Sequence, residues 1–127
     1  MSIEELYQKL GGSFAEVSER LPSLSLVERF IGKFLQDPSF NDLSESMNMG
    51  DRKGAFLASH TLKGICANLG FSALRKSSGE LCDELRGEGE GISDTAYLLM
   101  KDTERDYNVA VGAIRECTFV NDVRPKS

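Results

Sequence analysis

Apolar residues recur along most of the chain at the spacing of one face of an α-helix. In residues 24–35, LSLVERFIGKFL, they lie three or four positions apart and predict a wide apolar stripe. Similar spacing continues through residues 51–69 and 72–86, and near-heptad spacing runs from Asp94 to Cys117. No segment alternates with period two for long enough to predict a strand.

The N-terminal part of the chain carries start and stop signals for short helices. Ser2 and Ser13 can each cap one, because a serine hydroxyl accepts a hydrogen bond from a free N–H group at a helix N-terminus. Asp37–Pro38 indicates an N-cap followed by proline at the first helical position. We expect this third short helix to end at Gly50.

The longer helices are bounded in the same way. Asp51 predicts an N-cap, Gly70 predicts a left-handed helix end, and GEGEGIS, residues 87–93, predicts a loop. Together the elements predict an all-α fold, an antiparallel (up-down) four-helix bundle with short extra N-terminal helices. We assign residues 1–120 to a single domain and residues 121–127 to a flexible C-terminal tail.

Composition and charge exclude several classes of partner. The chain has 127 residues, of which 40% are hydrophobic and 28% charged, as expected for one soluble globular domain. Its net charge of -5 argues against nucleic acid and anionic membrane, because both are polyanions. Cys66, Cys82 and Cys117 are widely separated and odd in number, which predicts reduced, buried thiols. The charged N-terminus is no signal peptide, so we expect a cytoplasmic protein.

The single histidine, His60, lies within SHTLKGICANLG, residues 59–70. On a helical wheel of about 100° per residue, it falls nearly opposite the face that we expect to be buried. That face comprises Ala55, Ala58, Leu62, Ile65, Cys66 and Leu69. The outward stripe around His60 comprises Lys53, Phe56, Leu57, Lys63, Gly64 and Ala67.

The neighbours of His60 favour a chemical role for it. Helical side chains lean toward the N-terminus, so a side chain at position 64 would lie over the imidazole, and Gly64 has none. A glycine inside a helix costs about 1 kcal/mol relative to alanine. Lys63 would favour an anion bound to the ring, and a phosphoryl group on a ring nitrogen is such an anion. Taken singly, however, a solvated lysine and a packing glycine are the more common explanations.

The words HTLKG and ANLG, residues 60–64 and 67–70, resemble the signature of the histidine-containing phosphotransfer domain. The similarity continues through FSALRKSSGELCDELR, residues 71–86, and extends more loosely over the whole chain. It implies a phosphorelay intermediate of two-component signal transduction. Such a protein accepts a phosphoryl group from an aspartyl-phosphate receiver domain and passes it to another receiver.

The resemblance also implies roles for individual residues. His60 matches the phosphorylated histidine, Lys63 the lysine that neutralises the phosphoryl charge, and Gly64 the glycine that admits the receiver. The partner-binding surface that we expect comprises Phe56, Leu57, Ala67 and Phe71.

The resemblance further implies which partners and cofactors to expect. The partners are receiver domains of response regulators or of a hybrid sensor kinase. The receiver brings its own aspartate and Mg²⁺, so we expect no cofactor, no metal site and no autokinase or ATP-binding activity in this chain. Whether such an intermediate counts as an enzyme is left open, and a monomer is the simpler expectation.

Two other readings compete with a phosphorelay intermediate. One is a detached dimerisation and histidine-phosphorylation module of a sensor kinase. Such a module usually has an acidic residue directly after the histidine, where this chain has Thr61, and it needs an adjoining ATP-binding domain, for which 127 residues leave no room. The other is a non-transferring helical adaptor in which the His60 motif only packs.

Overall fold

The computed structural model describes residues 2–21 and 23–117, and within them it is entirely helical, with seven helices and no strand. The prediction of an all-α fold is confirmed. The predicted domain end at residue 120 and the predicted tail, residues 121–127, lie outside the described residues. In chain order the helices are α1 (Ile3–Lys9), α2 (Phe14–Arg20), α3 (Leu24–Phe34), α4 (Ser39–Met49), α5 (Arg52–Leu69), α6 (Ser72–Leu85) and α7 (Asp94–Arg115).

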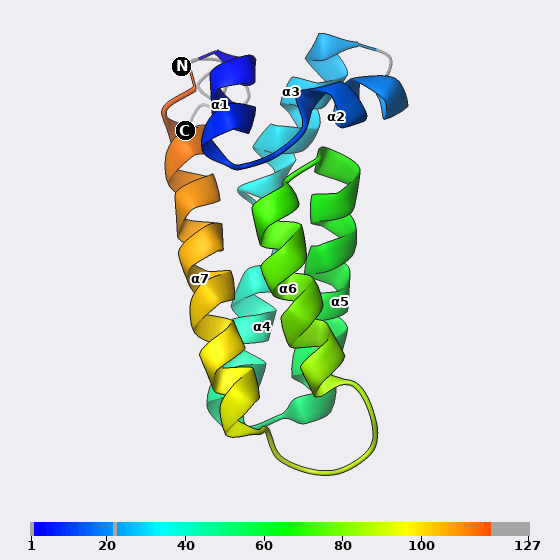
Figure 1. Cartoon of the computed structure of the whole chain (residues 1–127), viewed down its shortest axis with the longest axis vertical. Helices are drawn as coiled ribbons and strands as arrows, with labels where there is room; N and C mark the ends of the chain where they lie inside the picture. The colour runs from blue at the N-terminus through cyan, green and yellow to red at the C-terminus, as the bar shows by residue number, and fades with distance from the viewer. Residues whose placement is uncertain (1, 22, 118–127) are drawn as a thin grey trace.

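The last four helices form an up-down bundle, in which each helix runs opposite to the one before it (Figure 1). Extensive packing joins α4 to α5, α5 to α6 and α6 to α7. Two contacts bring α7 back onto α4. The rings of Phe40 and Tyr107 stack with their centroids 3.9 Å apart, and the Tyr97 hydroxyl donates to the carbonyl of Met47 at 2.9 Å. The short helix expected after Pro38 is thus a full member of the bundle.

Most of the predicted helix boundaries are confirmed by local hydrogen bonds. The side chains of Ser2, Ser13 and Asp51 each accept from the backbone N–H three residues later. Gly50 and Gly70 end α4 and α5 with φ of 69° and 71°, the left-handed conformation that glycine adopts without steric cost.

Two details of α3 and α4 differ from the prediction. Helix α4 begins at Ser39, one residue later than expected, because Asp37 accepts from the Ser39 N–H at 2.8 Å and leaves Pro38 at the cap position. In α3, Phe30 is 39% exposed although it belongs to the predicted apolar stripe. The helix therefore presents part of that stripe to the surface.

The N-terminal helices cover the upper end of the bundle and fix the end of α5 (Figure 1). The Tyr7 hydroxyl of α1 donates to the carbonyl of Leu69 at 2.6 Å, and the Ser13 N–H donates to the carbonyl of Gly70 at 3.1 Å. A Cβ at Gly12 would collide with that same Gly70 carbonyl, so this close backbone approach requires glycine. The helix that carries His60 is therefore anchored at its C-terminal end.

Candidate functional site

His60 lies in the middle of α5 with its side chain exposed. The opposite face of the helix is buried as predicted, with the exception of Ile65, which is half-buried. Among aromatic rings, that of Phe56, one turn earlier, is tilted against the imidazole with the centroids 6.1 Å apart. The imidazole is thus held at the surface by a helix whose other face is locked into the core.

Gly64 lies one turn after His60 and leaves open space there. A Cβ built at this position finds no heavy atom of the described residues within 4 Å, apart from its own helix backbone. Its φ is not positive, so neither a close contact nor backbone conformation requires a glycine. The missing side chain leaves the surface open one turn after His60.

The side chain of Lys63 extends from α5 to α6, where it lies beside Gly79. Its side chain is half-buried, and its Cδ lies 3.5 Å from the position that a Cβ on Gly79 would occupy. Among residues 2–21 and 23–117, the ion pairs are made by other cations, and none engages the Lys63 ammonium. Within the described residues, the Lys63 ammonium therefore has no carboxylate at ion-pair distance.

Arg86, which follows α6, contacts Phe56 one turn before His60. Its charge is already paired with Asp83, with nitrogen and oxygen 3.2 Å apart. The Arg86 guanidinium lies over the half-buried ring of Phe56, 5.4 Å from its centroid. Arg52 holds this segment in place, since it donates from Nε to the carbonyl of Leu85 at 3.1 Å and from a terminal guanidinium nitrogen to that of Arg86 at 3.0 Å. The contact between Arg86 and Phe56 could not be predicted from the sequence, because no local signal indicates how the end of α6 packs against α5.

Leu57 and Ala67 complete the surface on either side of His60. Leu57 is 56% exposed and lines a shallow groove between α4 and α5. Ala67 is half-buried, and its carbonyl accepts a hydrogen bond from Arg20 of α2. The structure therefore brings together five residues predicted from the sequence, which we call the docking stripe: Phe56, Leu57, Lys63, Gly64 and Ala67.

Phe71 does not belong to this surface. Its side chain is only 1% exposed, and its ring meets that of Phe34 edge-on at 5.2 Å and that of Tyr7 at 5.7 Å. The prediction that Phe71 contacts a partner is wrong. After the left-handed turn at Gly70, its side chain points into the core between α1 and α3.

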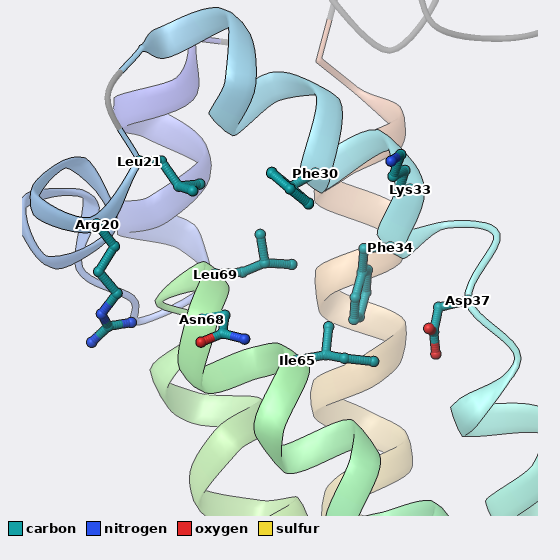
Figure 2. Close-up of a pocket in the computed structure, with 9 residues that line it drawn as sticks. All are labelled: Arg20, Leu21, Phe30, Lys33, Phe34, Asp37, Ile65, Asn68 and Leu69. Carbon is teal, nitrogen blue, oxygen red and sulfur yellow. The ribbon is translucent and has the colours of Figure 1, made fainter.

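An apolar cleft of about 350 Å³ opens beyond the docking stripe, toward the C-terminal end of α5 (Figure 2). Figure 2 shows Ile65, Asn68 and Leu69 of α5 on one side of the cleft and residues of α3 on the other. Asn68 lies one helical turn after Gly64, so the cleft adjoins the stripe. The lining residues are Arg20, Leu21, Phe30, Lys33, Phe34, Asp37, Ile65, Asn68 and Leu69.

A comparison with protein families decides what kind of domain carries this histidine. The family described as "Hpt domain" matches residues 14–105, which is more than half of the chain. The chain belongs to the Hpt family. The match runs from the start of α2 well into α7 and includes the whole of α5 with the docking stripe. No curated protein and no solved structure matches the chain.

Membership of the Hpt family implies histidine phosphotransfer in a two-component phosphorelay. Two further findings describe the Hpt domain. None of its described helices is both long and apolar enough to cross a membrane. In the described part of the chain, no three His, Cys, Asp or Glu side chains gather where they could hold a metal ion.

Proposed function

We propose that this Hpt domain accepts a phosphoryl group on His60 from the aspartyl phosphate of one receiver domain and passes it to a second receiver. The observation that carries the proposal is the placement of His60, exposed on α5 beside the open space at Gly64. In the accepting step, a ring nitrogen of His60 bonds to phosphorus while the bond to the aspartyl oxygen breaks and the carboxylate leaves. Onward transfer is the reverse of this step.

Lys63 offsets the charge that His60 acquires. A phosphoryl group brings about -1.5 to -2 charges, and a cation one helical turn away stabilises both the product and the developing charge in the transition state. The half-buried position of Lys63, with no acidic partner among the described residues, supports this role.

The partners that we propose are receiver domains of response regulators or of a hybrid sensor kinase. The receiver supplies the aspartate and the Mg²⁺, so the chain needs no metal or cofactor of its own for this exchange. The docking stripe suits a transient contact that buries less than about 1,200 Å². A cytoplasmic location and a monomeric state are part of the same proposal.

The test is transfer from a panel of purified receiver domains, each radiolabelled on its aspartate and freed of ATP. We expect at least one receiver to pass its label to the wild-type protein and none to label His60→Gln, although that variant should melt at the wild-type temperature. Equal labelling of His60→Gln would overturn the assignment of His60. A kinase module would instead be labelled only when a kinase ATP-binding domain and ATP are supplied, and an adaptor would not be labelled at all.

A further inference from the structure

We propose that Gly79 of α6 is a positioning residue for phosphoryl transfer, because it keeps longer side chains away from the seat on α6 in which the methylene stem of Lys63 lies. The inference rests on the proposed function and adds a residue of a different helix to the same site. It concerns how the lysine charge is held in place before the phosphoryl group arrives.

The contact between the two residues is specific. The three heavy atoms nearest to a Cβ built at Gly79 all belong to Lys63: Cδ at 3.5 Å, and Cγ and Cε at 3.9 Å each. The stem of the half-buried lysine therefore lies beside position 79 of α6, where an alanine methyl would touch it at ordinary van der Waals distance and only a longer side chain would compete with it for space.

The other common reasons for a glycine do not apply at position 79. It lies inside α6, away from both ends, and its φ is not positive, so the backbone conformation does not require glycine. None of the three nearest atoms belongs to the backbone of a neighbouring helix, in contrast to Gly12, where a carbonyl stands in the way. A glycine inside a helix lowers its stability by about 1 kcal/mol relative to alanine, and the three nearest atoms to its missing Cβ all belong to Lys63.

Seating the stem has a consequence for transfer. A free lysine side chain samples many rotamers. Ordering it costs conformational entropy, which reduces the net free energy of any contact that its ammonium makes. When the stem already lies on α6, the side chain is ordered during folding. The ammonium then needs less reorganisation when the phosphoryl group is transferred to His60. A larger side chain at position 79 would occupy the seat and displace the lysine.

The experiment compares Gly79→Gln with Gly112→Gln, a matched control. Gly112 also lies inside a helix, α7, and a Cβ built there finds no heavy atom of the described residues within 4 Å beyond its own helix backbone. Each variant is made in the wild-type and in the Lys63→Ala background. Phosphorylation of His60 is followed with a labelled receiver and with phosphoramidate, a small donor from which ammonia leaves as the ring nitrogen bonds to phosphorus.

We expect Gly79→Gln to slow phosphorylation about tenfold with either donor, as Lys63→Ala does, because each loses a charge-assisted contact. In the Lys63→Ala background, Gly79→Gln should cause no further loss. Gly112→Gln should match the wild type throughout. In the wild-type protein, NMR cross-relaxation should connect the Lys63 methylene protons with the Gly79 α-protons.

Several outcomes would overturn the role of Gly79. These are an equal further loss in the Lys63→Ala background, a loss with the receiver but not with phosphoramidate, a wild-type rate for Gly79→Gln, absent cross-relaxation, or melting of Gly79→Gln well below Gly112→Gln. They differ from failure of the proposed function, in which wild-type His60 itself would stay unlabelled with every receiver.

Discussion

At the scale of single residues, Lys63 and Gly64 are neighbours on α5 with different tasks, since one supplies charge and the other leaves space. We expect Lys63→Ala to slow acceptance of the phosphoryl group about tenfold, because it removes a charge-assisted contact of the transition state. Removing a partly exposed stem should change the free energy of unfolding by only about 0.5 kcal/mol. Stopped transfer reactions with a labelled receiver and urea titrations measure the two effects. Transfer at the wild-type rate would rule out the charge-neutralising role.

Gly64→Gln should lower the rate of transfer while the stability of the domain stays equal or rises. Glutamine favours helix over glycine by roughly 0.5–1 kcal/mol, and the open space around Gly64 can accept a side chain without a clash, so the melting temperature should stay equal or rise. The new side chain leans back toward His60 and should obstruct the receiver, so transfer should fall sharply. Calorimetry and transfer kinetics on the same sample check both. A folded variant with an unchanged rate would show that the approach path lies elsewhere.

At the scale of elements, the docking stripe and the core behind it give contrasting predictions for two apolar residues. Leu57 is 56% exposed, so Leu57→Ala should move stability by only about 0.5 kcal/mol while weakening receiver binding severalfold. Phe71 is buried against Tyr7 and Phe34, so Phe71→Ala should cost about 3–5 kcal/mol of the free energy of unfolding. Denaturant titrations measure stability, and NMR titration with a receiver measures binding.

The same titration locates the surface directly. Amide shifts caused by an added receiver should cluster around Phe56, Leu57, Gly64 and Ala67 on α5. The far side of the bundle provides the internal control, because α7 packs against α6 and carries none of the docking stripe. Shifts that instead concentrate on α7 would show that the receiver docks away from His60.

The elements themselves were largely predictable, because their signals are local. A serine or aspartate cap and a left-handed glycine act within a few residues, so Ser2, Asp51, Gly50 and Gly70 could be identified from the sequence. The direction of His60 followed from the period of a single helix.

The residues that sequence reasoning missed depend on how separate helices meet. Phe71 follows a glycine turn, and only the rings of Tyr7 and Phe34 make its inward direction evident. The seat of Lys63 on Gly79 depends on the register between α5 and α6, and the stacking of Arg86 on Phe56 depends on where α6 ends. Helical periodicity carries no information on such registers, so these contacts emerge only with the packed bundle.

At the scale of the whole molecule, folding buries an ionisable thiol on the helix that carries His60. Cys66 is fully buried on the inner face of α5. Burial, together with the negative charge of Asp37, raises the pKa of its thiol from 9.0 to about 12. Between these two pH values only the unfolded chain loses this proton, so a rise in pH favours unfolding. Below them both states keep the proton, and stability does not depend on this group.

We therefore expect the free energy of unfolding to fall from pH 9.0 toward pH 12, by about 1.4 kcal/mol per pH unit for this thiol alone. Guanidinium titrations at several alkaline pH values measure the slope, and Cys66→Ala, which cannot release the proton, is the control. Other groups, among them the buried Tyr7, whose pKa is also raised by burial, contribute equally to both proteins and cancel in the comparison. Only the difference between the two slopes tests the burial of Cys66. Equal slopes would mean that water reaches the thiol and that the inner face of α5 is less tightly closed than the packing of Cys66 requires.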